Sequence, residues 1–351
     1  MQTQGLNRLL VVTCSVALML MIGWLLRIGQ SILLPVLVAV IVVYVLTTAA
    51  DALERLPLVG RLRRRWRRLI VLTGIVASVL VLASFITTNA AAISAAIPGY
   101  AENFDALQAR LLHLLGVDEL PSWAQLSQRL LDLLDSTSLM PAALATITNA
   151  GSVVLAAALY AVFIVAELDG LPEKTRRALD RSEQAEHMLE VVQQINDRIG
   201  GYLAAKTLVN VILGLVSLAV LWALGIDFPV FWALVIALLN YIPYIGSVVA
   251  VAFPVTTSLV QFASFGHAAL ALVALMIPQM AVAYYIEPKF LGKSVNLSPF
   301  TVLLSLAIWT ALWGMMGAIL AIPLTAMVMI ILAELPSVRF VAVLMSETGD
   351  P

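Results

Sequence analysis

Long apolar runs separated by short polar segments dominate the chain. A run of about 20 apolar residues is long enough to cross the hydrocarbon core of a bilayer as a helix. The runs predict membrane spans near residues 9–26, 32–50, 69–92, 146–166, 203–224 and 267–286. Two further apolar stretches, 229–261 and 299–335, are interrupted by proline and glycine. This pattern predicts an all-α integral membrane protein with about eight membrane segments.

The two interrupted stretches repeat one design. In each, a proline opens the stretch, an inner glycine follows 17 or 18 residues later, and a second proline stands 25 or 24 residues after the first. These positions are Pro229, Gly246 and Pro254 in the first copy and Pro299, Gly317 and Pro323 in the second. Broken apolar segments at corresponding positions of two halves point to the binding site of a secondary transporter.

Each interrupted stretch is predicted to form a re-entrant hairpin. The 33 residues from Pro229 to Gln261 would make a helix of about 50 Å, whereas the hydrocarbon core is about 30 Å thick. The alternative is a pair of full spans joined by a tight turn, and for 299–335 this alternative stays open. In the hairpin interpretation, a span plus a hairpin enters from each face, so that residues 203–335 form an inverted-repeat transport core.

Charge predicts the topology. The loop from Asp51 to Arg68 carries seven arginines and two acids, so the positive-inside rule places this loop and the N-terminus in the cytoplasm. Segment 93–145 then forms an extracytoplasmic insert, segment 146–202 returns to the cytoplasm, and the tail 336–351 is cytoplasmic. The first apolar run is long enough to span and lacks a small-residue cleavage site after it, which favours a retained anchor over a signal peptide.

Two polar segments outside the spans have helical patterns. In the insert, Ser122–Gln125 resembles a capping box before a leucine-lined helix face, whereas His113 has no second metal ligand nearby and is expected at the surface. On the cytoplasmic side, Pro172 is predicted to open a long amphipathic helix, which either packs on its neighbours or contacts another subunit.

Composition agrees with a membrane protein and narrows the chemistry. With 62% hydrophobic and 12% charged residues, the chain cannot cover a soluble globule with polar surface. Its one cysteine, Cys14, excludes an intrachain disulfide and is expected to fill space in the core. No enzyme or phosphate-binding motif is found, so neither an enzyme nor a cofactor is predicted. The run Arg61–Arg68 suits anionic lipid headgroups better than nucleic acid, and topological anchoring is the simpler role.

Few ionisable residues interrupt the predicted core. Between Leu203 and Ala333 the acids are Asp227 and Glu287, and the lysines are Lys206, Lys289 and Lys293. Because charge within a membrane is costly, Glu287 and Lys206 are candidates for coupling transport to an ion. Both also lie near predicted span ends, where interfacial anchoring is an alternative explanation.

Polar residues and helix breakers gather at the two hairpin tips. The candidate substrate-binding residues are Asn240, Tyr241, Pro243, Tyr244, Gly246 and Ser247 at the first tip and Trp309, Thr310, Gly314 and Gly317 at the second. Freed backbone groups and these side chains could bind a small polar solute. The alternative is that Asn240 and Ser247 only satisfy the backbone of the broken helix.

Three ordered motifs resemble the AI-2E family, the autoinducer-2 exporter family of bacterial transporters. They are Asn240-Tyr-Ile-Pro-Tyr-Ile-Gly246, Glu287-Pro-Lys-Phe-Leu-Gly292 followed by Leu297-Ser-Pro299, and Trp313-Gly-Met-Met-Gly-Ala-Ile-Leu-Ala-Ile-Pro323. The resemblance implies a multi-pass protein of the bacterial inner membrane that forms a homo-oligomer such as a pentamer. It also implies either export of autoinducer-2 or sodium/proton antiport.

We therefore expect a secondary transporter that exports a small polar metabolite by alternating access. A cation/proton antiporter ranks second, because Glu287 is predicted close to the cytoplasmic edge. A non-transporting scaffold ranks third, because a scaffold has no need for broken helices at membrane depth.

Overall fold

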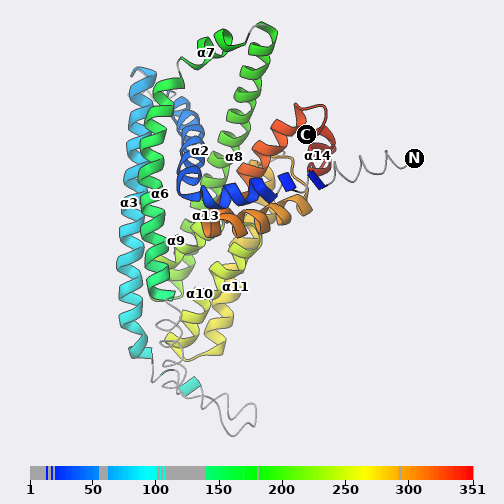
Figure 1. The fold of residues 1–351 in the computed structure, drawn as a ribbon. Coiled ribbons are helices and arrows are strands. Elements are labelled where there is room, and N and C mark those ends of the chain that lie inside the picture. Colours follow the sequence, from blue (N-terminus) through cyan, green and yellow to red (C-terminus); the bar gives the residue numbers. More distant parts are fainter. Residues whose placement is uncertain are drawn as a thin grey trace, which may run out of the picture. The chain divides into compact units, whose positions relative to one another are not determined.

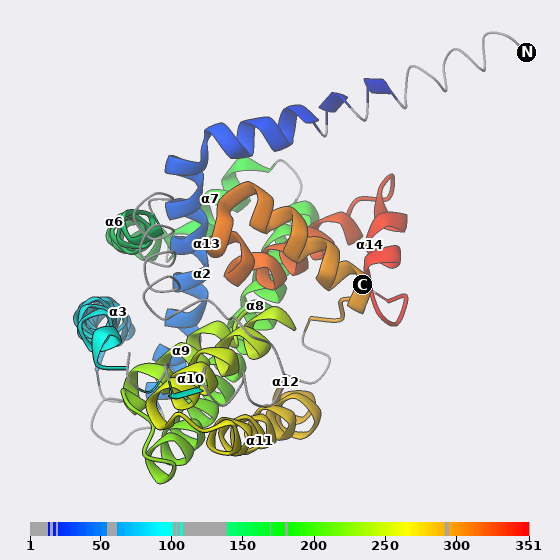
Figure 2. The ribbon, with the colours of Figure 1, turned by 90° about the horizontal axis from the view of Figure 1, so that it is seen from below.

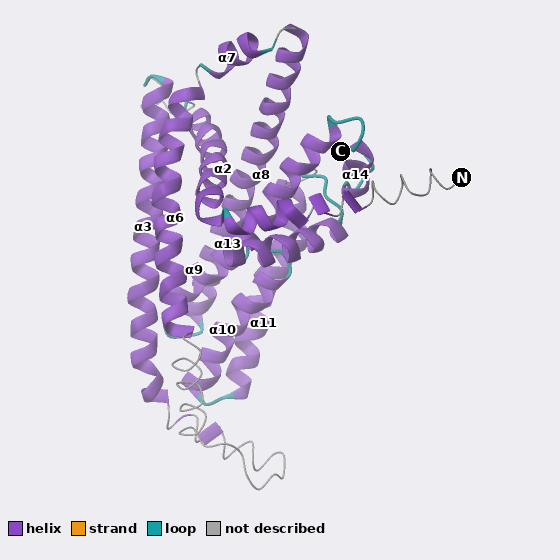
Figure 3. Ribbon diagram, viewed as in Figure 1, coloured by secondary structure: helices purple, strands orange, loops and turns teal. Residues whose placement is uncertain are grey.

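The computed structural model describes residues 20–54, 62–100, 139–168, 170–179, 182–291 and 295–350, with a few isolated positions before 20 and between 101 and 107. Within these ranges every regular element is a helix, apart from one isolated bridge between Leu297 and Ser346 (Figures 1 and 3). The elements are α2 (Gln30–Leu53), α3 (Arg64–Ala96), η1 (Ile97–Tyr100), α6 (Leu139–Leu168), α7 (Leu171–Ala178), α8 (Ser182–Ala223), α9 (Pro229–Leu239), α10 (Ile245–Phe262), α11 (Phe265–Ala281), η2 (Val282–Ile286), α12 (Glu287–Leu291), α13 (Pro299–Ala333) and α14 (Arg339–Met345).

Six of the described helices are long and apolar enough to cross a membrane. They include Gln30–Asp51, Arg65–Phe85, Ser182–Ala223, Ile245–Phe262, Phe265–Phe290 and Pro299–Ala333, and the bent pair Ser152–Leu168 with Leu171–Ala178 is a seventh candidate. The prediction of an all-α integral membrane protein is confirmed. Part of the predicted span 9–26 and most of the insert after Tyr100, with its capping box and His113, lie outside the described residues.

The helix predicted to begin at Pro172 differs from its prediction. Pro172 opens only the short helix α7, which ends at Ala178, and a new helix starts at Ser182. That helix, α8, then continues without a break for 42 residues to Ala223 and so includes the predicted span 203–224. Gly200 lies within α8 where a Cβ atom would stand 2.4 Å from Thr48 Oγ1 of α2, so this glycine allows α2 and α8 to pack closely. Cys14, expected in the core, is free and exposed.

The chain divides into two compact units, and the division runs through the range 203–335. Unit 1 comprises Met1–Asp51, Val153–Gly200 and Val295–Pro351, and unit 2 comprises Ala52–Ser152 and Gly201–Ser294. The core of unit 2 is a buried apolar cluster drawn from the second half of α8 and from α9, α10 and α11. Figure 2 views the end of this unit, where α9, α10 and α11 lie side by side.

In unit 1, the C-terminal residues pair with the segment that leads into α13. Besides the bridge between Leu297 and Ser346, the Ser298 amide donates to the Met345 carbonyl at 2.9 Å, and the Glu347 amide donates to the Asn296 carbonyl at 3.1 Å. The last residues described are therefore bound to the start of α13 by main-chain hydrogen bonds.

Candidate functional site: two broken hairpins and a buried ion pair

The first interrupted stretch is a helical hairpin within unit 2. Helix α9 has 11 residues, about 16 Å of helix, which is too short to cross a bilayer. The chain breaks at residues 240–244 and returns as α10, which packs against α9. The two arms approach so closely that a Cβ atom on Gly246 would lie 1.8 Å from the Leu239 carbonyl oxygen. Only glycine fits there.

The second interrupted stretch, α13, forms the same kind of hairpin within unit 1. The backbone leaves helical geometry at Trp313 and Gly314. The Trp309 indole donates a hydrogen bond to Thr325 Oγ1 at 2.9 Å, although the two residues are 16 positions apart in the sequence. In a straight helix, 16 residues would separate them by about 24 Å. A Cβ atom on Gly317 would lie 1.9 Å from the Trp309 carbonyl oxygen. The chain has therefore folded back on itself.

The two hairpins share their backbone construction. Leu239 and Trp309, whose carbonyls face the inner glycines, each stand ten residues after the opening proline. Tyr244 and Gly314 each stand fifteen residues after it, and both have φ of 61°. The repeat seen in the sequence is thus present in three dimensions as two hairpins with matching breaks, which favours the re-entrant interpretation over two full spans in each stretch.

A buried polar cluster lies beside the first hairpin break. The Lys206 ammonium forms an ion pair with the Glu287 carboxylate. Asn240 Nδ2 donates to Asn210 Oδ1 at 2.8 Å and, more weakly, to Glu287 Oε1 at 3.4 Å. Lys206, Asn210 and Asn240 are 6%, 2% and 8% exposed, whereas the Glu287 side chain is 27% exposed, so a buried ammonium and two buried amides meet a partly exposed carboxylate. A buried ion pair of this kind is stable only when its remaining hydrogen-bonding groups are satisfied.

The local fold explains why these residues meet. Lys206 and Asn210 are four residues apart on α8 and so share one helix face. Asn240 ends α9 at the point where the chain turns. Next to the cluster, the Thr207 and Tyr241 hydroxyls are hydrogen-bonded at 2.7 Å.

Glu287 is placed by a π turn. Residues Val282–Ile286 form a π-helical turn, in which the Glu287 amide donates to the Val282 carbonyl, five residues earlier. The cause is visible in the sequence: Pro288 has no N–H and its ring cannot fit against the carbonyl of the preceding turn, so the helix widens before it. π turns are rare and occur frequently at functional sites. Here the wider turn directs Glu287 toward Lys206.

The second break, in unit 1, is surrounded by two tryptophans and an arginine instead of an ion pair. The ring centres of Trp309 and Trp313 lie 5.0 Å apart, and the Trp313 indole donates to the Leu26 carbonyl at 3.1 Å. The Arg27 guanidinium donates to the Ala311 carbonyl at 2.8 Å. The break in the helix leaves that carbonyl without its usual amide partner, and a cation at the C-terminal end of a helical arm is favourable.

The structure separates the predicted site residues into groups. Asn240, Glu287 and Lys206 belong to one cluster, and Tyr241 is adjacent to it. Ser247 donates to the Tyr244 carbonyl at 3.1 Å and so serves the backbone of the hairpin. Pro243, Tyr244 and Gly246 shape the first turn, as Gly314 and Gly317 shape the second. Thr310 lies exposed on α13.

Sequence reasoning missed Asn210 and Arg27. Asn210 lies in the middle of a predicted span and carries no charge, although its spacing of four residues from Lys206 placed both on one helix face. Arg27 follows directly after the first apolar run, at a position where long basic side chains commonly reach the membrane interface. Neither was near a helix break in the sequence.

The far end of unit 2 is closed by a second set of polar contacts. The Tyr100 hydroxyl donates to the Asp227 carboxylate at 2.6 Å, and the Gln261 side chain bonds both the Asp227 amide and the Gly225 carbonyl at 2.9 Å. Burial and the neighbouring Asp227 carboxylate raise the pKa of Tyr100 above its ordinary value. These contacts join η1, which follows α3, to the loop that connects α8 with α9 and join that loop to the last turn of α10.

Comparison with known proteins agrees with this architecture. The sequence model of the AI-2E family transporter matches residues 14–337. The AI-2 transport protein TqsA of Escherichia coli (strain K12) is 30% identical over 324 residues, which cover 92% of this chain and 91% of that protein. A putative transport protein of Borreliella burgdorferi is 34% identical over 172 residues, covering 48% and 47%. The putative transport protein YhhT of Escherichia coli (strain K12) is 30% identical over 202 residues, or 57% of each chain.

The family match spans both hairpins, both units and the buried cluster, and the relatives are transport proteins. The chain is thus a multi-pass membrane transporter that belongs to the AI-2E family.

Proposed function

We propose that this protein is a secondary transporter that exports a small polar metabolite, autoinducer-2 or a solute of similar chemistry, through the inner membrane of a bacterium. The observation that carries the proposal is the buried cluster of Lys206, Asn210, Asn240 and Glu287 beside a broken helix. The name of the TqsA relative, an AI-2 transport protein, supports the choice of substrate.

The cluster suits a neutral, oxygen-rich solute. Its two charges compensate each other, so no net charge is left to attract an ionic substrate. The amides and the ion pair together offer donors and acceptors for hydroxyl and carbonyl groups. In this proposal each hairpin tip also offers polar contacts, those of the second being Trp309 and Thr310. Rocking or elevator-like displacement of the hairpin unit provides alternating access.

Efflux from reconstituted vesicles tests the proposal. Vesicles loaded with autoinducer-2 should release it faster with the protein than without it. Asn240→Ala should slow release about tenfold or more, because a lost hydrogen bond worth about 1.4 kcal/mol changes an affinity tenfold. Thr256→Val is the matched control, since Thr256 is an exposed polar residue of α10 that bonds only the Ala252 carbonyl. Equal release from protein-containing and empty vesicles would reject autoinducer-2 as a substrate.

Cation/proton antiport is the second candidate, and the Lys206–Glu287 pair favours it. A partly exposed carboxylate held against a buried ammonium can exchange its partner for a proton or a cation. Glu287→Gln should abolish sodium-dependent proton movement in vesicles if Glu287 carries the coupling. Proton movement that is unchanged in this variant would remove Glu287 from any coupling role.

The orientation proposed for the transporter follows the charge of its loops. The termini, the arginine-rich loop and the segment around Ser294 are cytoplasmic, whereas Gln261 and Asp118 face outward. Single cysteines at positions 118, 261 and 294 in a Cys14→Ser background can be labelled with an impermeant thiol reagent. Labelling of position 294 from outside would contradict the inverted arrangement of the two hairpins.

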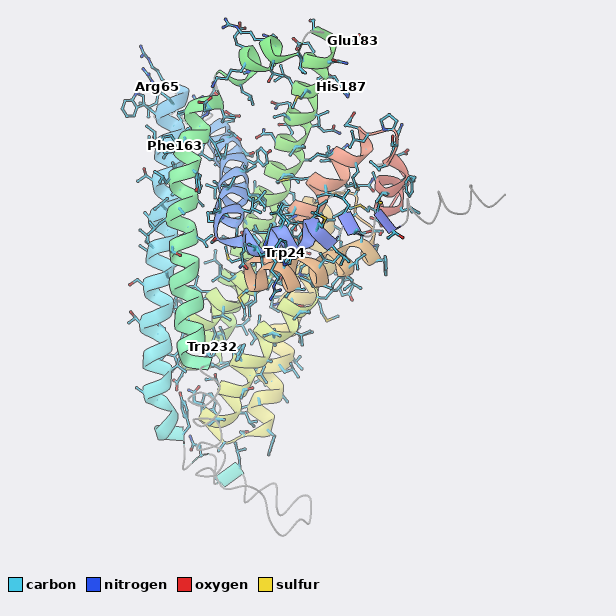
Figure 4. The ribbon with its side chains drawn as sticks, in the orientation of Figure 1. Trp24, Arg65, Phe163, Glu183, His187 and Trp232 are labelled. Atoms are coloured by element: carbon cyan, nitrogen blue, oxygen red, sulfur yellow. The ribbon has the colours of Figure 1, made fainter. Side chains whose placement is uncertain are left out.

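We also propose that the protein forms a homo-oligomer and binds anionic lipid. The Arg61–Arg68 run remains the candidate lipid contact, although Arg67 and Arg68 are each only 5% exposed and Arg67 pairs with Glu54 at 2.7 Å. The exposed residues Arg63, Arg65 and Trp66 are therefore the better lipid ligands (Arg65 is labelled in Figure 4).

A further inference from the structure

Four polar side chains in the interior of unit 2 have no hydrogen-bond partner among the described residues. Their unpaired atoms are Ser217 Oγ, Trp232 Nε1, Ser258 Oγ and Gln279 Nε2. These residues are 1%, 8%, 0% and 5% exposed. Buried polar groups in folded proteins are nearly always paired, either with the protein or with bound water. Four such groups inside one small helical unit therefore call for a ligand.

Three of the four lie at the same depth below the ion-pair cluster. The reference level is set by Asn210, Asn240 and Glu287, which are in mutual contact through Asn240. Along α8, Ser217 is seven residues beyond Asn210, and along α9, Trp232 is eight residues before Asn240. At 1.5 Å per residue both are about 10–12 Å away.

Gln279 reaches this depth along α11. It precedes Glu287 by eight residues, which again is about 12 Å. Eight residues make about 2.2 turns of α-helix, and the π turn before Glu287 accommodates an extra residue, so Gln279 and Glu287 return to nearly the same face. The helices also run in the required directions, because the His267 ring contacts the Leu224 carbonyl at 3.1 Å at the far end of both α8 and α11.

The Trp232 ring is held by apolar neighbours, while its N–H has no acceptor. It lies edge-on to Phe231, with ring centres 4.9 Å apart, and stacks on Phe253 at 5.8 Å. These contacts restrict the orientation of the ring on α9. The indole cannot turn its N–H to a backbone carbonyl without losing both.

We infer that the interior of unit 2 holds bound water at this second polar level, coordinated by Ser217, Trp232 and Gln279. An indole N–H and an amide NH₂ donate only, so they need an oxygen acceptor, and a serine hydroxyl needs a partner that can donate or accept. Water satisfies all three and is the smallest molecule that does so. An apolar occupant would leave every one of these atoms unpaired.

The proposed water site lies farther into unit 2 than the ion pair. Ser258 stands one helical turn before Gln261, whose side chain is part of the polar contacts at the far end of unit 2. The second level thus lies between the Lys206–Glu287 pair and that end. This inference rests on the interior of unit 2 and stands whether or not autoinducer-2 is the substrate.

Nuclear magnetic resonance of the full-length protein, labelled with ¹⁵N at its tryptophan indoles and with no solute added, tests the inference. Magnetisation transfer from water to the Trp232 indole should be at least threefold stronger than to Trp313. Trp313 is the matched control, because it is 3% exposed and its indole donates to the Leu26 carbonyl. The Trp232→Phe spectrum identifies the Trp232 signal. Equally weak transfer to both indoles would overturn the inference.

A second measurement asks whether the three residues share the water. Gln279→Leu and Ser217→Ala should each at least halve the transfer to Trp232, whereas Thr256→Val should leave it unchanged. Thermal unfolding of each variant confirms that it is folded. If folded Gln279→Leu and Ser217→Ala keep the full signal, the shared site is wrong. If a variant does not fold, the comparison of Trp232 with Trp313 in the unaltered protein decides.

Discussion

Replacing Gly246 by alanine should strongly destabilise the first hairpin. The new Cβ atom would stand 1.8 Å from the Leu239 carbonyl oxygen and 2.7 Å from its carbon, against 3.4 Å or more in ordinary contacts. Both clashing atoms belong to the backbone, so no side-chain rotation relieves them and the two arms must separate. Forcing an atom into a packed interior costs about 1–3 kcal/mol, and more where the backbone must move.

The control is Gly201→Ala in α8. No atom lies within 4 Å of a Cβ built on Gly201, and alanine is favoured over glycine in a helix by about 0.5–1 kcal/mol. The two variants should therefore differ by about 2–4 kcal/mol in the free energy of unfolding. At roughly 2–4 °C per kcal/mol for a large domain, the apparent Tm of Gly246→Ala should be about 5–15 °C below that of Gly201→Ala.

Thermal unfolding of the purified protein in detergent, followed by tryptophan fluorescence, measures this difference. Gly317→Ala should behave like Gly246→Ala, because its Cβ would meet the Trp309 carbonyl oxygen at 1.9 Å. Equal Tm values for Gly246→Ala and Gly201→Ala would refute the close approach of the hairpin arms.

Three further predictions concern the second turn, the ion pair and the far end of unit 2. Gly314→Ala meets no atom within 4 Å, but its φ of 61° should cost about 1–2 kcal/mol, and a Tm equal to that of the unaltered protein would contradict this. Lys206→Met alone should destabilise by about 1–3 kcal/mol, because the partly exposed Glu287 carboxylate loses its ammonium partner. The double variant with Glu287→Leu should recover most of the loss, and additive losses in a double-mutant cycle would disprove the coupling. The pKa of Tyr100 is raised in the folded protein. The stability that its hydrogen bond to Asp227 contributes is therefore present below about pH 10, the ordinary tyrosine pKa, and is lost as the pH rises above it. This alkaline loss should be smaller in Tyr100→Phe, which Tm values measured from pH 8 to 11 will test.

The sequence determined the class of protein and the positions of the helix breaks. Apolar runs of sufficient length predicted the spans, because the bilayer leaves a chain few other solutions. The spacing of Pro229, Gly246, Pro299 and Gly317 predicted the repeat, since proline and glycine act on the backbone locally and in the same way wherever they stand. Charge alone made Lys206 and Glu287 candidates.

Tertiary structure decided which of these residues meet. Lys206 and Glu287 are 81 residues apart. Whether they form an ion pair depends on how α8 and the start of α12 come together and on the π turn Val282–Ile286 before Glu287, and periodicity reveals neither. The contribution of Asn210 and the unpaired atoms of Ser217, Trp232 and Gln279 were likewise invisible in the sequence. A polar residue within an apolar span has the same local pattern whether it faces lipid, a neighbouring helix or bound water, and only the packing of the helices distinguishes these environments.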